Sequence, residues 1–453
     1  MSRTKEEILA QSFAQSREGH HELVMYSLRK MAEPHVKENY HTLTNLPNLK
    51  ALFYLGDEMT MENPDREFAI IILDIAQFKA VNEFCGRVGG DALLIHIAGL
   101  LEKMAAEREL TIACHMRADV FILYTAFEEE QELIDIVEKL KDDIEKYEIA
   151  CKIMLAFGIC TSVKNGRAVS YLKDCATTAL NTIKGKFYTS YAFFDENMRR
   201  EQMRKQQIEN DVLPAMRNDE FKLFIQPKVD MSTGKIIGGE CLVRWLTPMG
   251  MCSPGDFIPV LERDGFIINL DTYIWEKAFA FLAELRKEGM QQVPLSMNVS
   301  RVHAYDDGFV EKLFELSEVY KIEPSMVTLE LTESAFLGDE SLMYERMKRL
   351  QERGFKISID DFGTGYSNMK LLKTNFVDEI KVDRSFMMDI ECERSKIVVK
   401  HTLDLLHAVG VEVVIEGVET QEQEKFLLSC GCKTAQGFRY YRPMLCSDFK
   451  ALL

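Results

Sequence analysis

The feature that most constrains the fold is a unit repeated through the C-terminal half of the chain, an apolar strand that ends in a polar side chain. Amphipathic stretches such as 342–353 and 395–409 lie between these strands, and successive strand ends are about 20 to 58 residues apart, as in β–α units. A (β/α)8 barrel builds its active site at the C-terminal ends of its strands, so the pattern predicts such a barrel and the place of its site. Seven strands end in this way, with Glu240, Asn298, Glu330, Asp360 and Asp361, Lys381 and Asp383, Glu416, and Gln436.

One of these strands leads into a group of adjacent acids. The strand over 355–361 alternates apolar and polar residues and ends in Asp360 and Asp361. Gly363 and Gly365 follow, and they let the backbone turn sharply and approach a ligand closely. Adjacent acids repel each other and resist burial unless a cation or a set of donors compensates their charge. The stretch is therefore either a divalent-cation site or an acidic loop in solvent.

Composition limits the class of protein. The chain has 453 residues, enough for two or three domains with separate cores. Its apolar content of 47% and charged content of 28% are typical of a globular protein. The net charge of −17 argues against a DNA- or RNA-backbone binder, which needs a basic face. An acidic chain can still bind a small anion when metal ions intervene.

The sequence predicts a cytoplasmic protein that does not enter a membrane. No apolar run approaches the roughly 18 residues that a membrane helix needs, and the polar start MSRTKEE is unlike a signal peptide. The eleven cysteines are scattered, and the closest two, Cys430 and Cys432, lack a second pair for zinc. Free thiols in a reducing cytosol are the simplest account.

Residues 1–40 predict a helical arm. Its weakly amphipathic segments should end at Pro34, because proline cannot continue a helix. The adjacent His20 and His21 are either metal ligands or a solvated surface pair. Neighbouring residues point to different helix faces, which favours the surface pair.

Residues 41–195 predict a compact α+β domain. The strand over 68–75 is continuously apolar, as in a buried strand, and the elements follow a βααββαβ-like order with a tight turn near Arg117. A highly charged helix over 196–217 should connect this domain to the C-terminal domain, residues 213–453, as a solvated spacer.

The domain at 41–195 resembles GGDEF domains, the diguanylate cyclase family, although the signature has decayed. LTNLPN resembles the family's LTGLPNR opening, LDIAQFKAVNEFCGRVGGDALL resembles its DIDxFKxxND…GD segment, and HMRADVF stands in place of RxGGDEF. The second acid of the DID pair is Ala76. The family's polar residues that remain are Asp74, Asn82, Asp91 and Asp119.

The lost signature residues predict a domain without cyclase activity. Arg117 and Ala118 replace two glycines that let the backbone approach a guanine nucleotide, and we expect Arg117 to fill that space. Val120 replaces the catalytic acid, so one Mg²⁺ ligand is missing. Arg108 matches the start of the family's inhibitory RxxD site, but Thr111 stands where its acid should be. A structural or regulatory role remains.

Residues 213–453 resemble the EAL domain, a cyclic di-GMP phosphodiesterase, along their whole length. The motif EALLRW appears as ECLVRW over 240–245, with Cys241 in place of alanine. QPKV, SMNVS, LELTES, DDFGTGYS, IKVDRSF, EGVET and QGF also occur in the family's order. The family's barrel has an antiparallel first strand, and the stretches 221–230 and 235–245 suit that opening pair.

The residue types at the strand ends indicate the metal. The candidate ligands are carboxylates and one amide, and such hard oxygen ligands suit Mg²⁺ or Mn²⁺ rather than Zn²⁺. Two such cations can generate a hydroxide and neutralise charge in an in-line displacement at a phosphodiester. The resemblance implies that two ions are held by Glu240, Asn298, Glu330, Asp360, Asp361 and Glu416.

The resemblance also implies catalytic and substrate-binding residues. Lys381 would assist the nucleophile or the phosphate charge, and Gln436 would orient the water in a catalytic set that includes Glu416. An arginine is a natural fork for a phosphate group. The residues implied in binding cyclic di-GMP are Gln226, Arg244 and Asp383.

A further acid and a loop are implied in regulation. Glu333 would anchor the loop from Asp361 to Asn368, which family members use to couple dimerisation to metal binding. A homodimer through the EAL domain is therefore expected. Asn368 and Met369 replace a Ser-Leu pair, which could change the mobility of the loop without removing a ligand.

Three hypotheses on function follow. The first is an active phosphodiesterase that opens cyclic di-GMP to linear pGpG. The second is a non-catalytic receptor that binds cyclic di-GMP and signals to a protein partner. Degenerate receptors in the family generally lack some metal ligands, and this chain retains the full set, which favours the enzyme. A bifunctional cyclase and phosphodiesterase is the third, and Arg117 and Val120 argue against it.

Overall fold

The computed structural model describes residues 39–161, 168–186, 189–336, 340–363, 371–373 and 376–453. The predicted arm up to residue 38, including His20 and His21, lies outside the described residues, as do Asn368 and Met369. The chain divides into two compact units, Met1–Arg204 and Lys205–Leu453, and each is described by itself.

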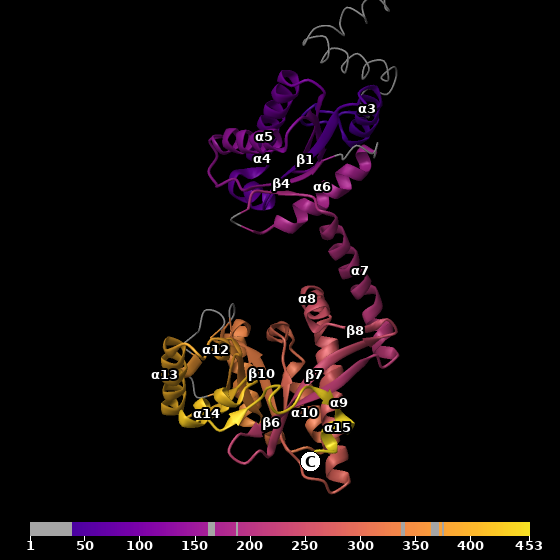
Figure 1. The fold of residues 1–453 in the computed structure, drawn as a ribbon. Helices are drawn as coiled ribbons and strands as arrows, with labels where there is room; N and C mark the ends of the chain where they lie inside the picture. Colours follow the sequence, from indigo (N-terminus) through magenta and orange to yellow (C-terminus); the bar gives the residue numbers. More distant parts are fainter. Residues whose placement is uncertain (1–38, 162–167, 187–188, 337–339, 364–370, 374–375) are drawn as a thin grey trace, which may run out of the picture. The chain divides into compact units, whose positions relative to one another are not determined.

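The first unit is an α+β domain built on a five-stranded sheet (Figure 1). Its elements in chain order are α3 (Leu49–Glu62), β1 (Glu67–Ile75), α4 (Phe78–Glu107), β2 (Thr111–Arg117), β3 (Val120–Phe127), α5 (Glu130–Glu145), β4 (Leu155–Thr161), α6 (Val169–Ile183) and β5 (Tyr191–Phe193).

The sheet of the first unit is covered by helices on both faces. Its strand order is β2-β3-β1-β4-β5, with β5 parallel to β4 and the other neighbours antiparallel. Ile71 and Leu73 of β1 pack with side chains of α4 and α5, whereas Ile70 and Ile72 pack with α3 and α6. Burial on both faces explains why the central strands are continuously apolar. The three-residue β5 is too short for its period to show in the sequence.

Among the described residues, α4 is the helix whose length and apolar composition would suit a membrane span. Its residues Leu93, Ile97 and Leu101 are buried against the sheet. Gly86 interrupts the helical backbone with φ 72°. The buried side chains of this helix serve the core of the first unit, whereas Phe84, Val88 and Ile95 of the same helix are exposed.

The helix α7 (Glu196–Arg217) crosses the division between the two units. It has the same bounds as the predicted connecting helix and includes Pro214. Most of its side chains are exposed, and Ile208, Val212 and Ala215 are the buried ones.

The second unit is a barrel of strands surrounded by helices (Figure 1). Its strands are β6 (Phe221–Asp230), β7 (Ile236–Thr247), β8 (Gly250–Cys252), β9 (Leu295–Asn298), β10 (Val327–Thr332), β11 (Lys356–Phe362), β12 (Glu379–Val382), β13 (Glu412–Ile415), β14 (Thr434–Ala435) and β15 (Met444–Leu445). Its helices are α8 (Pro254–Asp264), α9 (Ile267–Lys287), α10 (Phe309–Tyr320), α11 (Glu340–Glu352), α12 (Ser385–Met388), α13 (Glu393–Val409), α14 (Gln421–Ser429) and α15 (Cys446–Lys450), with the short 3-10 turns η2 (Arg301–Tyr305), η3 (Pro324–Met326), η4 (Glu333–Phe336) and η5 (Leu371–Lys373).

Eight of the described strands close the barrel, in the order β6-β14-β13-β12-β11-β10-β9-β7 and back to β6. The first strand, β6, is antiparallel to both β7 and β14, and the other neighbours in the ring are parallel. The parallel register aligns Asn298 with Glu330, and Thr332 with Asp360. This topology confirms the predicted barrel with an antiparallel first strand and brings the polar strand ends to one edge.

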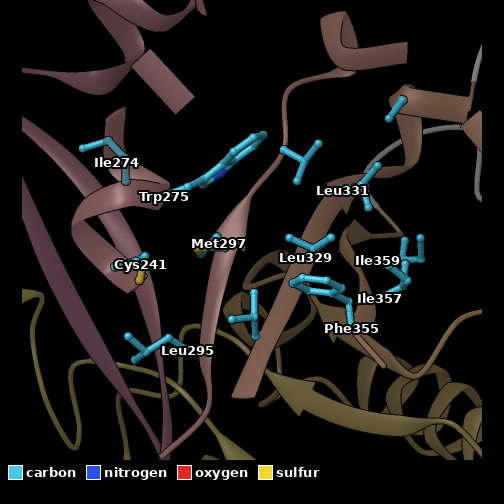
Figure 2. Close-up of a cluster of buried hydrophobic side chains, with 14 of the residues drawn as sticks. Cys241, Ile274, Trp275, Leu295, Met297, Leu329, Leu331, Phe355, Ile357 and Ile359 are labelled. Atoms are coloured by element: carbon cyan, nitrogen blue, oxygen red, sulfur yellow. The ribbon is translucent and has the colours of Figure 1, made fainter. Parts of the chain in front are cut away.

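Alternation along the strands separates an apolar outer layer from a polar interior. Figure 2 shows Leu329 and Leu331 of β10 beside Ile357 and Ile359 of β11, in a cluster of buried apolar side chains that also includes Trp275 of α9. The residues between them point to the opposite face, because successive side chains of a strand alternate. The interior of the barrel is therefore where the acids lie.

Candidate metal centre

Lys381 of β12 lies at the centre of four acids inside the barrel. Its side chain is 1% exposed, and its Nζ lies 3.0 Å from Glu240 Oε2 and 2.9 Å from Glu330 Oε2. The same nitrogen lies 3.1 Å from Asp360 Oδ1 and 2.7 Å from Glu416 Oε1. The acids come from β7, β10, β11 and the residue after β13, so the strand register brings together residues that are far apart in the sequence. The expectation that a strand ends at Glu240 was wrong, because the residues after Glu240 continue to pair with β6 and extend β7 to Thr247.

Two overlapping groups of three carboxylates could each hold a cation. Glu240, Glu330 and Asp360 form one group, and Asp360, Asp361 and Glu416 form the other. Within each group the oxygen atoms lie within 4.8 Å of one another. Asp360 belongs to both groups, so a single carboxylate could face two ions. Carboxylate oxygens of this kind are the ligands that divalent cations such as Mg²⁺ take.

The backbone at Asp361 is held in an uncommon conformation. Asp361 has φ 54°, in the left-handed region that non-glycine residues seldom adopt. Its backbone N–H donates to Asp360 Oδ1 at 2.9 Å. Residues in such conformations cluster at functional sites, where surrounding contacts keep them in place.

The electrostatics of the acids fit a site for divalent cations. Burial raises the pKa of Glu416 to about 8, and it also raises the pKa of Glu240 and of Asp360. Burial alone would lower the pKa of Lys381, but the surrounding carboxylates raise it well above its ordinary value. The single charge of Lys381 leaves these acids under-compensated, and cations among them would restore the balance.

Three amide side chains border the acids. Gln436 Nε2 donates to Glu240 Oε2 at 2.5 Å and to Gln226 Oε1 at 3.1 Å. Gln226 in turn donates to the carbonyl oxygen of Tyr441 at 3.1 Å. Asn298 Nδ2 lies 3.5 Å from Glu240 Oε1. The predicted water-orienting, substrate-binding and ligand amides thus lie beside Glu240.

The remaining predicted site residues lie at the periphery of the acids. Arg244 Nη1 donates to the carbonyl oxygen of Val243 at 2.8 Å, and its guanidinium lies 5.9 Å from the ring centre of Phe224. Asp383 accepts a hydrogen bond from the backbone of Ser385 at 2.9 Å, and its charge, after burial, helps to raise the pKa of Asp361, so it lies near the metal-site acids.

Glu333 connects η4 to the chain that follows the metal-site acids. Its Oε1 accepts a hydrogen bond from the backbone N–H of Gly363 at 3.2 Å. Gly363 comes two residues after Asp361, and the rest of that loop, 364–370, lies outside the described residues. The contact joins Glu333 to the start of that loop, and its anchoring role stays a prediction.

Two cavities adjoin the acids and share Glu240 and Leu242 in their walls. The larger has a volume of about 560 Å³, and its lining includes Arg244, Asn298, Glu262, Asp271 and Ser300. The smaller has a volume of about 240 Å³, and its lining includes Gln226, Glu416, Gln436 and Arg384. Glu240 therefore stands between two spaces that a ligand could occupy together.

A second polar layer lies deeper in the barrel and was not among the predicted site residues. Lys228 Nζ lies 3.0 Å from Glu330 Oε1, 2.8 Å from Glu379 Oε1 and 2.7 Å from Ser296 Oγ. Each of these residues except Glu330 is two positions from a predicted site residue on its own strand. The alternation of strand side chains is the signal that could have found them.

The first unit contains a cavity at the degenerate cyclase signature. Its volume is about 860 Å³, and Asp74, Asp119 and Arg117 line it. Arg117 is exposed and lines this space without filling it, contrary to the expectation from the sequence, because the side chain extends from a tight turn at the surface. Lys184 Nζ lies 2.8 Å from Asp74 Oδ2, so this acid, one of those retained from the cyclase signature, already forms an ion pair with a lysine.

Other signature positions of the first unit have acquired structural contacts. Val120 is buried in an apolar cluster, and Ala118 has φ 49°, so the turn keeps a conformation that suits glycine. Thr111 Oγ1 is buried 2.7 Å from Thr125 Oγ1. Arg108 forms an ion pair with Glu132 at 3.0 Å.

The remaining two acidic or amide signature residues lie on α4. Asp91 is exposed, and Asn82 is half-buried with its Oδ1 near Gly90. Neither lines the cavity of the first unit.

The chain is similar to known proteins in both units. Residues 209–443 match the family model described as EAL domain, and residues 38–187 match the one described as Diguanylate cyclase, GGDEF domain. The bifunctional diguanylate cyclase/cyclic di-GMP phosphodiesterase MucR of Pseudomonas aeruginosa is 30% identical over 413 residues, which cover 89% of this chain and 60% of that protein. The cyclic di-GMP phosphodiesterase NbdA of the same organism is 27% identical over 430 residues, covering 92% of this chain and 53% of that protein. The chain thus spans little more than half the length of these relatives.

Two solved structures are similar to parts of the chain. The MucR phosphodiesterase in complex with c-di-GMP is 31% identical with a TM-score of 0.51, and the match covers 54% of this chain and 99% of that one. The EAL enzyme Bd1971, in a form bound to cAMP and cyclic di-GMP, is 22% identical with a TM-score of 0.55, over 85% of this chain and 94% of that one. The second likeness concerns the fold alone.

Proposed function

Because the chain belongs to the EAL domain family, with a GGDEF domain ahead of the EAL domain, we propose that its second unit is a metal-dependent phosphodiesterase that hydrolyses cyclic di-GMP to linear pGpG. The observation that carries this proposal is the pair of carboxylate groups that share Asp360 around Lys381. The match to the MucR phosphodiesterase covers nearly all of that structure, which supports the same ligand for this chain.

The proposed metal ligands are residues whose side chains the barrel brings together. Two Mg²⁺ or Mn²⁺ ions would be held by Glu240, Asn298, Glu330, Asp360, Asp361 and Glu416. Bound there, such ions supply charge neutralisation and an acidified water for attack on phosphorus.

The other residues of the centre hold and orient the reactants. Lys381 donates to acids on several sides, so it supplies positive charge where a phosphate oxygen arrives. Gln436 is fixed between Gln226 and Glu240 and would orient the attacking water. Arg244 stands in the wall of the larger cavity, where its guanidinium could donate two hydrogen bonds to two oxygens of a phosphate group.

The two cavities support a ligand with two nucleoside halves. Cyclic di-GMP carries two guanines on opposite sides of its phosphodiester ring, and the cavities adjoin on Glu240 and Leu242. Guanine presents N–H donors on its Watson–Crick edge, and the larger cavity contains the carboxylates of Glu262 and Asp271 as acceptors. The smaller cavity, with Arg384 in its wall, would take the other half.

The first unit is proposed to be inactive as a cyclase. Val120 removes an acid from the signature, and Lys184 pairs with Asp74 at 2.8 Å, which removes a second carboxylate from metal binding. A cyclase needs acids to hold Mg²⁺ against the triphosphate, so the loss of two weakens that site strongly. The unit would then serve a structural or regulatory role.

A homodimer through the EAL domain is also proposed. The helix α13 exposes Ile397 and Val398 at 56% and 51%, and Leu405 and Val409 are exposed on the same helix. Apolar side chains gathered on one exposed helix mark an interaction surface more often than scattered ones do. The resemblance to family members that dimerise indicates a second copy as the occupant.

Product analysis tests the proposed function. Purified protein should convert cyclic di-GMP to pGpG with Mg²⁺ or Mn²⁺, and a chelator should stop the reaction. Binding of cyclic di-GMP without any product, under the same conditions, would favour the non-catalytic receptor instead.

A further inference from the structure

Lys228 of β6 is a buried cation on the side of Glu330 away from Lys381. Its side chain is 6% exposed, and its ammonium donates to Ser296 Oγ at 2.7 Å, Glu379 Oε1 at 2.8 Å and Glu330 Oε1 at 3.0 Å. An ammonium has three N–H donors, so each donor of Lys228 has one partner. The side chain is therefore fixed in one orientation.

The carboxylate of Glu330 is held between two lysines. Its Oε1 faces Lys228 at 3.0 Å, and its Oε2 faces Lys381 at 2.9 Å. The side chain of Glu330 is fully buried, with 0% exposure. Burial opposes ionisation, but the two ammonium groups lower the pKa of Glu330 to about 2. Only Oε2 lies on the side of Glu240 and Asp360, where the metal centre would be.

Glu379 balances the charge of Lys228. These two residues form an ion pair at 2.8 Å and line a separate cavity of about 370 Å³ with Lys356, Glu412 and Lys433. Those residues stand at the N-terminal ends of the parallel strands, so this cavity opens at the other end of the barrel from the metal centre. The pair is neutral as a whole, and Glu330 keeps its negative charge for the metal side.

We propose that Lys228 is a positioning residue of the metal centre, which occupies Glu330 Oε1 and so presents Glu330 to a metal through Oε2 alone. The inference rests on the proposed function, because it assumes that Glu330 is a metal ligand. Groups that orient metal ligands typically change metal affinity by about 10- to 100-fold when they are removed. A buried ion pair that served stability alone would leave metal affinity unchanged.

A double variant separates positioning from folding. Lys228→Met alone would leave Glu379 as a buried acid without its partner, and such losses are strongly destabilising. Lys228→Met with Glu379→Gln removes the pair and leaves the net charge unchanged, and replacing a whole buried pair is often neutral for stability. Glu379→Gln alone is the matched control, because it retains the contact between Lys228 and Glu330.

Calorimetric titration with Mn²⁺, in the absence of substrate, provides the readout. The double variant should melt close to the wild type and bind Mn²⁺ about 10- to 100-fold more weakly, whereas Glu379→Gln alone should change the affinity less than about threefold. Wild-type affinity in the folded double variant would overturn the proposal. If the double variant does not fold, Lys228→Met with Glu379→Met decides: it replaces the whole pair by apolar side chains of similar volume without a change in net charge, and wild-type Mn²⁺ affinity there would equally overturn the proposal.

The same titration distinguishes this inference from the proposed function. A wild-type chain that binds Mn²⁺ but releases no pGpG would refute the phosphodiesterase, and the variants would still test Lys228. A wild-type chain that binds no Mn²⁺ would refute both.

Discussion

Replacing Glu416 by glutamine should stabilise the metal-free protein and abolish its activity at the same time. Burial, partly offset by Lys381 and reinforced by Asp360 and Glu240, raises the pKa of Glu416 from 4.5 to about 8. A carboxyl group whose pKa is higher in the folded state binds its proton more tightly there. Its ionisation therefore destabilises the fold progressively as the pH rises from 4.5 towards 8.

The magnitude follows from the size of this shift. One pKa unit corresponds to about 1.4 kcal/mol, and pH 7 lies about 2.5 units above the ordinary value of 4.5. Glu416 therefore destabilises the metal-free fold at pH 7 by on the order of 3 kcal/mol. Glutamine has the same shape without the charge. For a unit of this size, the melting temperature should rise by about 6 to 12 °C at pH 7 and by little near pH 4.

Thermal unfolding in a chelating buffer, from pH 4 to pH 9, measures this effect. Added Mn²⁺ should stabilise the wild type more than the variant, and turnover of the variant should fall by about 10²-fold or more. Glu391 is exposed, so Glu391→Gln is the matched control and should change neither the melting temperature nor the turnover. A variant that melts at or below the wild-type temperature at pH 7, or one with wild-type turnover, would refute the reasoning.

Three further predictions concern the cation, the first unit and the assembly. Ca²⁺ should permit binding of cyclic di-GMP without turnover, because it takes more ligands at longer distances than Mg²⁺; rapid hydrolysis in Ca²⁺ alone would contradict the two-metal account. Purified protein should make no cyclic di-GMP from GTP, and micromolar GTP should change hydrolysis little; severalfold activation would show that the cavity beside Arg117 is a nucleotide sensor. Val398→Asp on α13 should convert a dimer to a monomer in light scattering, and a variant that stays dimeric would exclude this helix as the interface.

The barrel and the place of its acids could be predicted because they depend on two simple regularities of strands, the alternation of side chains and the common direction of parallel strands. Alternation gives each strand its inward face, and parallel strands carry their last residues to the same edge. Glu240 and Glu416 are far apart in the sequence, yet both lie within about 3 Å of Lys381 Nζ. Their meeting follows from the order of the strands alone.

The contacts between residues at different depths of the barrel could not be predicted in the same way. Lys228 and Glu379 lie one layer below the acids, and the contacts of Lys228 with Glu330 and Glu379 depend on the register of β6, which runs antiparallel to its neighbours. The sequence does not indicate which oxygen of Glu330 Lys228 contacts and which one Lys381 contacts. The direction of a side chain at a turn also cannot be read from the sequence. Arg117 therefore lines a cavity that it was expected to fill.

The most direct test is the initial rate of cyclic di-GMP hydrolysis, measured for the wild type and Glu240→Ala side by side with saturating Mn²⁺. Glu240 is buried, contacts Lys381 and Gln436, and belongs to one of the two carboxylate groups. The account predicts steady turnover to pGpG by the wild type and a loss of about 10²-fold or more in the variant. Near-equal rates, or no turnover by the wild type, would contradict it.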